Sequence, residues 1–368
     1  MSDTVGLLQS PLDAVHRRLG ATFTDFGGWE LPVRFGSDLA EHKAVRTAAG
    51  QFDLSHMAQF DLVGPGAGPG LDYALMGEHS TMPLGRASYS MILTPEGTVI
   101  DDLIVYRLGQ EHYFVISNAA NRLVVAAALK ERLAGFDTTL EDQTLARALI
   151  AVQGPASLDV ISAAGLPQAT QLGYYRAMEY TLEAVPIVVA RTGYTGENGF
   201  EVSCPREEAE DLWQLFARAG EPFGLVPCGL ACRDTLRLEA AMPLYGHELD
   251  LDTTPIEGGQ GAFVRPKAAD FVGAAALRER TPRKHLVGLR GEGRRAARAG
   301  YQLSAPDGAP AGHVTSGALS PTLGYPIALA SVLGPEAPAA GTVLQVDIRG
   351  TSTPYTVVPT PFYTKEKK

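Results

Sequence analysis

The texture of the sequence changes near residue 284, and this change constrains the fold more than any other feature. Before it, amphipathic segments with helical spacing alternate with short apolar runs typical of strands. After it, short β-like runs are separated by turns rich in Gly and Pro, at residues 285–289, 312–316, 327–332, 343–348 and 356–358. The sequence therefore predicts an α+β body without a doubly wound parallel sheet, followed by an all-β barrel or sandwich.

The body contains both periodicities along its whole length. Helices are predicted over residues 10–19, 38–49, 123–133, 207–219 and 234–241, with Ser10 as a cap for the first helix and Gly50 ending the second. Strands are predicted over residues 59–63, 86–93, 148–153, 185–192 and 200–202, and a loop over 26–32. A chain of 368 residues exceeds the usual single-domain range, so two or three domains are expected.

Composition excludes several classes of function. The formal net charge of −10 disfavours generic binding to nucleic acid, because no broad positive field attracts phosphates. No window approaches 18 consecutive apolar residues, and the first 20 residues lack the pattern of a targeting segment. The three cysteines, Cys204, Cys228 and Cys232, form no even framework and no metal-ligand pattern. They predict reduced packing residues in a cytoplasmic protein without a bound metal.

One stretch departs from the overall acidity. Residues 278–298 contain eight Lys or Arg and only two acids, Glu279 and Glu292. Such a segment suits an anionic partner or ligand, and it equally suits a solvated linker.

Two apolar runs flank a short polar break between residues 97 and 121, which predicts a β-hairpin. Asp101 and Asp102 stand near the start of its first strand, and the second strand ends in Ser117 and Asn118. Neighbouring strand residues face opposite ways, so only one aspartate can point into a given cavity. The alternative is that both aspartates are solvated turn residues, and spacing alone favours that alternative.

Residues 191–201 carry glycines at 193, 196 and 199. This spacing lets a backbone approach a flat ligand closely, with Tyr194 as a stacking face and Glu201 as an acceptor for a donor-rich ring. The stretch is neither a P-loop nor a dinucleotide fingerprint. A decorated hairpin loop is the alternative explanation.

Arg233 and Arg237 are four residues apart, so they share one face of the predicted helix. Spacing alone favours a surface face with ion pairs to Asp234 and Glu239. An arginine near a helix start is also suited to bind a carboxylate ligand. The histidines, including His56 and His247, are scattered and complete no nucleophilic triad or metal cluster.

In order along the chain, short stretches resemble the T-protein family of the glycine cleavage system, the aminomethyltransferases. The matching stretches cover residues 25–32, 52–57, 100–105, 117–119, 191–197, 199–201, 233–240, 254–257 and 314–317, with Ser320 and Pro321. Each is short, and their order across almost the whole chain makes the resemblance specific.

The resemblance implies a three-domain cloverleaf around a central tetrahydrofolate site. Residues 1–50 with 145–280 would form one α+β folate-binding domain, residues 51–144 a second, and residues 284–368 a jelly-roll or Greek-key barrel. The implied reaction moves the aminomethyl carbon from lipoylated H-protein to tetrahydrofolate, releasing ammonia and giving 5,10-methylenetetrahydrofolate. A folate-dependent demethylase on the same scaffold and a non-enzymatic folate-binding module are the rival interpretations. No flavin domain and no Lys-Gly-Cys motif supports either rival.

The resemblance also implies roles for individual residues. Asp102 matches the family's catalytic carboxylate near nitrogen 10 of the folate, which leaves Asp101 as a solvated turn residue. The residues that match the folate-binding positions are Met57, Asn118, Tyr194, Glu201, Arg233 and a C-terminal aromatic, Tyr363 or Phe362. Two departures from the family pattern stand out. Residues 259–263 lack the usual Trp and end in Phe263, and cysteines occupy positions 228 and 232, where small residues are common.

Overall fold

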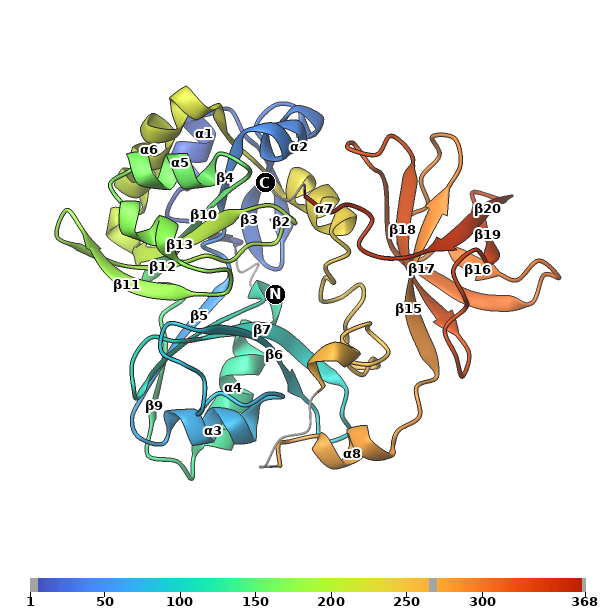
Figure 1. The fold of residues 1–368 in the computed structure, drawn as a ribbon, viewed down its shortest axis with the longest axis horizontal. Helices are drawn as coiled ribbons and strands as arrows, with labels where there is room; N and C mark the ends of the chain where they lie inside the picture. Colours follow the sequence, from blue (N-terminus) through green and yellow to red (C-terminus); the bar gives the residue numbers. More distant parts are fainter. Residues whose placement is uncertain (1–5, 265–269, 366–368) are drawn as a thin grey trace. The chain divides into compact units, whose positions relative to one another are not determined.

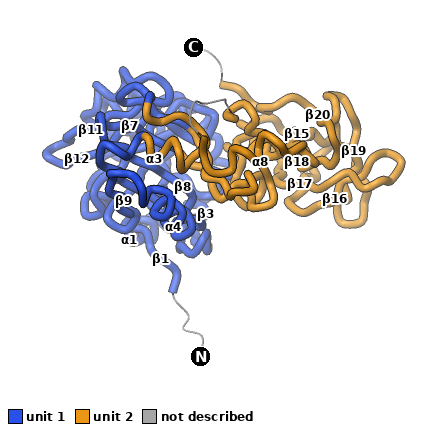
Figure 2. The backbone as a smooth tube through the Cα atoms, turned by 90° about the horizontal axis from the view of Figure 1, so that it is seen from below, with its two compact units in different colours: residues 1–68, 81–88, 104–234 blue, residues 69–80, 89–103, 235–368 orange. Residues whose placement is uncertain are grey.

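The structure, a computed structural model, describes residues 6–264 and 270–365. The chain divides into two compact units, each assembled from several segments (Figure 2). The first unit comprises residues 1–68, 81–88 and 104–234, and the second comprises residues 69–80, 89–103 and 235–368. The three-domain division inferred from the family resemblance stays a prediction.

A six-stranded sheet forms the core of the first unit (Figure 1). Its strand order is β11 (Ala177–Leu182), β12 (Val185–Ala190), β13 (Gly199–Pro205), β10 (Arg147–Gln153), β4 (Ala49–Asp53) and β14 (Leu225–Pro227). All neighbours are antiparallel except β14 and β4, which run parallel. The strand β10 is buried on both faces, which explains its continuous apolar run from residue 148 to 152.

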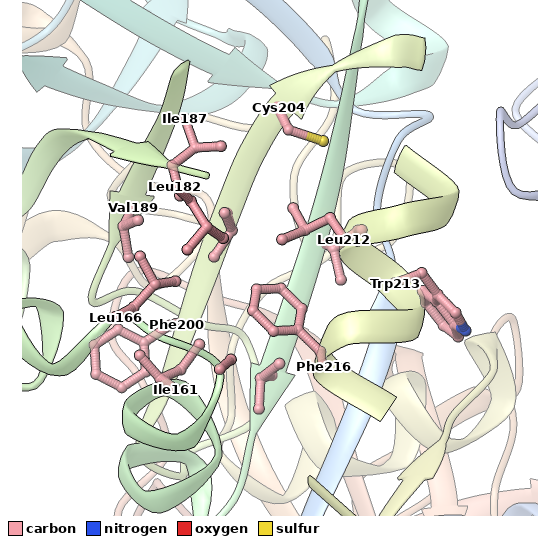
Figure 3. Close-up of a cluster of buried hydrophobic side chains, with 14 of the residues drawn as sticks. Ile161, Leu166, Leu182, Ile187, Val189, Phe200, Cys204, Leu212, Trp213 and Phe216 are labelled. Atoms are coloured by element: carbon pink, nitrogen blue, oxygen red, sulfur yellow. The ribbon is translucent and has the colours of Figure 1, made fainter. Parts of the chain in front are cut away.

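Helices α5 (Ser157–Ala163) and α6 (Ala209–Gly220) cover one face of this sheet. Leu212, Trp213 and Phe216 recur at helical spacing on α6 and are buried. Figure 3 shows Leu212 and Phe216 pointing toward the strand that carries Cys204. The helix α1 (Asp13–Arg18) adds Val15 to the same apolar cluster.

The remaining strands of the first unit form smaller sheets. A three-stranded sheet has the order β1 (Leu8–Gln9), β3 (Trp29–Arg34) and β2 (Thr22–Phe26). A five-stranded sheet has the order β6 (Ala87–Leu93), β7 (Val99–Arg107), β8 (His112–Ser117), β5 (Ala58–Val63) and β9 (Thr139–Asp142). The division between the two units falls within β6 and β7. The predicted hairpin is confirmed, because its two strands, β7 and β8, are neighbours in this sheet.

The second unit contains a closed six-stranded barrel, in agreement with the predicted change of texture. Its strands follow the order β15 (Lys284–Gly291), β18 (Pro326–Leu333), β17 (Pro310–Leu319), β16 (Gln302–Ser304), β19 (Val343–Ile348) and β20 (Thr351–Val358). Its apolar interior includes Leu289, Val314 and Val346. The sequence pattern missed the three-residue strand β16. Assignment of the barrel to the jelly-roll type stays a prediction.

Three further helices lie close to their predicted positions: α2 (Asp38–Thr47), α4 (Arg122–Leu133) and α7 (Leu230–Glu239). Two short helices, α3 (Ala67–Ala74) and α8 (Ala274–Glu279), were not predicted. Across the two described ranges, every helix is too short or too polar to span a membrane.

Some local predictions were wrong. Ser10 does not cap α1: its hydroxyl bonds to the buried carboxylate of Asp53 and accepts the Leu12 amide at 3.1 Å. Gly50 does not end a helix, because α2 already ends at Thr47 and Gly50 lies within β4. A Cβ atom there would lie 2.4 Å from Cγ2 of Val45, so this strand position accepts only glycine without rearrangement. The predicted loop over residues 26–32 contains a hairpin turn and most of β3. The expectation of no targeting segment falls partly on residues 1–5, outside the described ranges.

Candidate functional site

The glycine-rich stretch connects β12 to β13 and wraps around one side chain, Gln153. Its amide donates from Nε2 to the Thr192 carbonyl at 3.1 Å and accepts the Thr195 hydroxyl at 2.9 Å. A Cβ atom on Gly193 would lie 2.0 Å from Oε1 of Gln153, and one on Gly199 would lie 2.2 Å from Nε2. Close packing on a glutamine therefore accounts for two of the three glycines, and the sequence pattern gave no sign of this partner.

A buried ion pair fixes the tip of the same loop. Arg46 on α2 lies 2.9 Å from the Glu197 carboxylate and donates to the Thr195 carbonyl at 2.7 Å. Such anchoring restricts the backbone on both sides of Gly196, which has a φ of +77°. Tyr194 thus lies on a loop that Gln153 and Arg46 both hold in place.

Glu201 is the third residue of β13 and is 8% exposed. Its carboxylate accepts a short hydrogen bond from the Thr192 hydroxyl, which lies 3.3 Å from the Tyr106 hydroxyl. Burial raises the pKa of Glu201 above its ordinary value, although Thr192 and the positive charge of Arg233 oppose that shift. A buried carboxylate held in this way is suited to accept hydrogen bonds from a ligand rich in N–H groups.

Arg233 lies near the start of α7 and is half-buried. Its guanidinium carbon lies 4.6 Å from the centre of the Tyr194 ring, the geometry of a cation–π contact. The same guanidinium interacts electrostatically with Glu201 and with His56. The fold therefore brings Arg233 onto Tyr194 and places its charge where it acts on Glu201.

Met57 and Asn118 lie at one end of the pair β5–β8. Ala58 pairs with Ser117 in this antiparallel register, so Met57 and Asn118 directly follow as the next opposing pair. Both are half-buried. The first unit thus contains five of the predicted site residues: Met57, Asn118, Tyr194, Glu201 and Arg233.

Asp101 and Asp102 are the third and fourth residues of β7, in the second unit. Asp101 is fully buried, so its prediction as a solvated turn residue was wrong. Asp102 is half-buried and lies within a strand, so the alternative of a solvated turn residue does not hold for it either. The Tyr89 hydroxyl donates to Oδ2 of Asp102 at 2.9 Å. Sequence reasoning missed this partner of Asp102, because a lone tyrosine in a strand carries no distinguishing signal.

Phe263 ends the stretch that departs from the family pattern, and it contacts the tyrosine of this hydrogen bond. Its ring packs edge to face on Tyr89 with centroids 4.9 Å apart. Phe263 thus packs against the tyrosine that holds Asp102.

The C-terminal aromatics differ in their surroundings. Phe362 packs into an apolar cluster with Leu238, Ile327 and Leu329. The backbone N–H of Tyr363 donates to the Glu239 carbonyl at 2.9 Å, which ties the C-terminal segment to the end of α7.

The predicted surface face of α7 is instead buried at its second half. Arg237 is 1% exposed, lies 3.0 Å from the Glu248 carboxylate and donates to the Ser316 hydroxyl at 2.8 Å. Glu239 is also buried and accepts the hydroxyls of Ser320 and Thr322. The surface interpretation was wrong because the barrel unit supplies hydrogen-bond partners far away in sequence.

The basic stretch is largely engaged with neighbouring groups. Arg278 pairs with Asp270, Arg290 stacks on Tyr325 at 4.2 Å, and Arg298 donates to a backbone carbonyl. Arg294 and Arg295 are exposed, on a segment whose backbone is bonded to the buried hydroxyl of Tyr355.

The cysteines are free and buried, and Cys204 packs in the core of the first unit, as predicted. Within residues 6–264 and 270–365, no cluster of His, Cys, Asp and Glu is arranged to hold a metal ion.

The fold defines a class of protein: a body of helices and mixed sheets followed by a closed β-barrel. The family model described as the GCVT N-terminal domain matches residues 12–268, and that of the glycine cleavage T-protein C-terminal barrel domain matches residues 284–364. The chain therefore belongs to the glycine cleavage T-protein family.

Individual relatives match this chain over almost their full length. The aminomethyltransferase of Streptomyces avermitilis is 52% identical over 97% of both chains, and that of Desulfitobacterium hafniense is 39% identical over 98% of this chain and 99% of its own. The crystal structure of glycine cleavage system aminomethyltransferase T from Bartonella henselae superposes with a TM-score of 0.91. It is 34% identical and covers 98% of this chain and 99% of its own. The chain is accordingly an enzyme of the aminomethyltransferase type.

Proposed function

We propose that this enzyme transfers the aminomethyl carbon of lipoylated H-protein to tetrahydrofolate. In that reaction the carbon loses its bonds to ammonia and to the lipoyl sulfur, and it gains bonds to nitrogens 5 and 10 of the folate. The two protons released by those nitrogens go to the departing amine and thiolate. The products are ammonia, dihydrolipoyl H-protein and 5,10-methylenetetrahydrofolate. The full-length match to aminomethyltransferases supports this proposal.

The folate-binding residues in this proposal are Met57, Asn118, Tyr194, Glu201 and Arg233, with Tyr363. The cluster of Glu201, Arg233 and Tyr194 is the observation that carries it, since it combines a buried acceptor, a cation and a stacking face. A reduced pterin offers an N–H edge for the carboxylate and a flat ring for the tyrosine. Packing of Phe362 into an apolar cluster supports Tyr363 as the C-terminal contact.

Asp102 is the catalytic residue of the proposal. Nitrogen 10 of tetrahydrofolate is an arylamine and a weak nucleophile, so a carboxylate that accepts its N–H promotes ring closure and stabilises the positive charge that develops there. The hydrogen bond that the Tyr89 hydroxyl donates to Oδ2 holds this carboxylate in position.

H-protein is the macromolecular partner in this proposal, and the exposed pair Arg294 and Arg295 is its docking site. We place the reaction in the cytoplasm, which three free buried cysteines support. The larger architecture of the proposal is a three-domain cloverleaf whose domains supply one folate site.

The decisive experiment mixes the protein with tetrahydrofolate and aminomethyl-loaded H-protein and measures ammonia and 5,10-methylenetetrahydrofolate. Formation of both products in equal amounts is the expected result. Absence of product, together with release of a methyl group from a methylated amine in the presence of tetrahydrofolate, would replace the transferase with a demethylase.

A further inference from the structure

His56 directly precedes Met57 and is 1% exposed, with no hydrogen-bond partner for its Nδ1 atom among the described residues. Buried polar atoms are almost always hydrogen-bonded, because leaving one unpaired sacrifices its interaction with water. An unpaired imidazole nitrogen next to a predicted folate-binding residue is therefore a group that a ligand could satisfy.

The neighbours of His56 do not supply that partner. The Phe26 ring meets the imidazole edge to face, with centroids 5.6 Å apart, and has no polar atom to offer. The carboxylate of Asp53, which also acts on His56 electrostatically, already receives hydrogen bonds from His16, Ser10 and the Ser55 amide. These contacts fix the imidazole and leave its Nδ1 atom unbonded.

The position of His56 connects it to the site already described. The guanidinium of Arg233 acts electrostatically on His56 as well as on Glu201, and it stacks on Tyr194. Arg233 thus contacts Tyr194 and acts electrostatically on both Glu201 and His56, and Tyr194 and Glu201 are already assigned to the folate in the proposal.

We propose that Nδ1 of His56 hydrogen-bonds the reduced folate, which makes His56 a further binding residue of the site. This inference rests on the proposed function. A neutral imidazole suits the role because each ring nitrogen is either a donor or an acceptor, according to the tautomer, so it can match a pterin atom of either kind.

The electrostatic surroundings keep the imidazole neutral. Burial, followed by the positive charge of Arg233, lowers the pKa of His56 to about 4, against a smaller opposing effect of Asp53. Protonation would place a second cation beside Arg233, so the neutral form is the one available to a ligand near pH 7.

The test compares two substitutions of His56 in the full-length enzyme. His56→Leu removes the polar atoms with little change in volume, and His56→Asn keeps a polar group near the position of Nδ1. We expect His56→Leu to raise the KM for tetrahydrofolate about tenfold, the effect of one lost hydrogen bond, with an equal or higher melting temperature. His56→Asn should restore most of the affinity.

Ser157→Ala is the matched control, because Oγ of Ser157 is also buried without a partner but lies on α5, among residues of the hydrophobic core. It should leave the KM for tetrahydrofolate unchanged. A direct readout is the ¹⁵N chemical shift of Nδ1 in histidine-labelled protein, which should move on addition of tetrahydrofolate alone.

The outcomes separate the two proposals. An active wild-type enzyme whose His56→Leu and His56→Asn variants keep the wild-type KM, with no shift of the Nδ1 resonance, overturns the role of His56 only. A folded wild-type enzyme that binds tetrahydrofolate but makes no product overturns the transferase, and a shifted Nδ1 resonance in that case still supports the contact. If His56→Leu does not fold, the KM of His56→Asn and the Nδ1 shift decide the question.

Discussion

Arg233 and Arg237 are one helical turn apart on α7, and the protein uses them in opposite ways. Arg237 is buried, paired with Glu248 and bonded to Ser316 of the barrel. Arg233 is half-buried, stacks on Tyr194 and acts electrostatically on Glu201 and His56. The second half of the helix neutralises its charge inside the fold, whereas the first half directs its charge at the candidate site. Residue type therefore says less about the role of a side chain than the surroundings that the fold gives it.

The same contrast separates the carboxylates. Glu239 accepts two hydroxyls and a backbone amide from residues 320–322, so its acceptor capacity serves the fold. Asp102 is half-buried and bonded to the Tyr89 hydroxyl. Substitutions should therefore divide into those that reduce turnover and those that reduce stability.

The largest expected effect is on turnover, from Asp102→Asn. The amide keeps the size of the side chain but accepts the N–H of nitrogen 10 poorly and does not stabilise positive charge, so kcat should fall by roughly 10²–10⁴. Tetrahydrofolate binding and melting temperature should stay close to wild type. Parallel measurement of ammonia release and folate affinity checks this, and full turnover in the variant would refute the role of Asp102.

Arg237→Gln and Arg233→Gln, the same substitution one turn apart, test the comparison directly. Arg237→Gln leaves the buried Glu248 carboxylate unpaired and should reduce the free energy of unfolding by about 3–5 kcal/mol. Arg233→Gln should reduce it by less than about 1 kcal/mol and raise the KM for tetrahydrofolate about tenfold. Denaturant unfolding and steady-state kinetics on both variants give the answer. Equal losses of stability would show that the two arginines are alike.

His56 extends the comparison to pH. Its pKa of about 4 in the folded chain is below its ordinary value of 6.5, so between these pH values the unfolded chain binds a proton that the folded chain does not. Stability due to a neutral His56 is therefore complete above pH 6.5 and declines as the pH falls toward 4, by an amount on the order of 3 kcal/mol.

The control for this pH effect is His56→Leu, which removes the titration. Between pH 7 and pH 4.5, the unfolding free energy of the wild type should fall more than that of the variant. Asp53 stays ionised across this range, because its pKa is lowered to about 2 by its hydrogen bonds to His16, Ser10 and Ser55, despite its burial. Parallel stability profiles for the two proteins would contradict the depressed pKa of His56.

The predictability of the fold from the sequence depended on how local its determinants are. The barrel and the strands β7 and β8 were predictable because period-2 apolar runs and Gly-rich turns act within a few residues. Gly50 was misassigned because its role depends on contact with Val45 and Cys228, and a helix-ending glycine looks the same in sequence. The role of Gln153 was invisible for the same reason, since its partners are the Thr192 carbonyl and the Thr195 hydroxyl.

The site residues came mainly from the ordered family motifs, because spacing alone left each pair of alternatives open. Strand alternation required Asp101 and Asp102 to face opposite ways, and their unequal burial agrees with that rule. It did not identify Tyr89 or His56. Both contribute through contacts between distant segments, and such contacts leave no local pattern.

The smallest expected effect concerns the exposed pair Arg294 and Arg295, whose charges lack the burial that distinguishes Arg237. Reversal of both to Glu should raise the KM for H-protein several-fold at low salt, and the effect should shrink at 0.5 M salt because ions screen exposed charges. Turnover at saturating H-protein and the KM for tetrahydrofolate should not change. Arg278→Glu is the matched control, since Arg278 already pairs with Asp270. If the double reversal leaves the KM for H-protein unchanged at low salt, H-protein docks elsewhere.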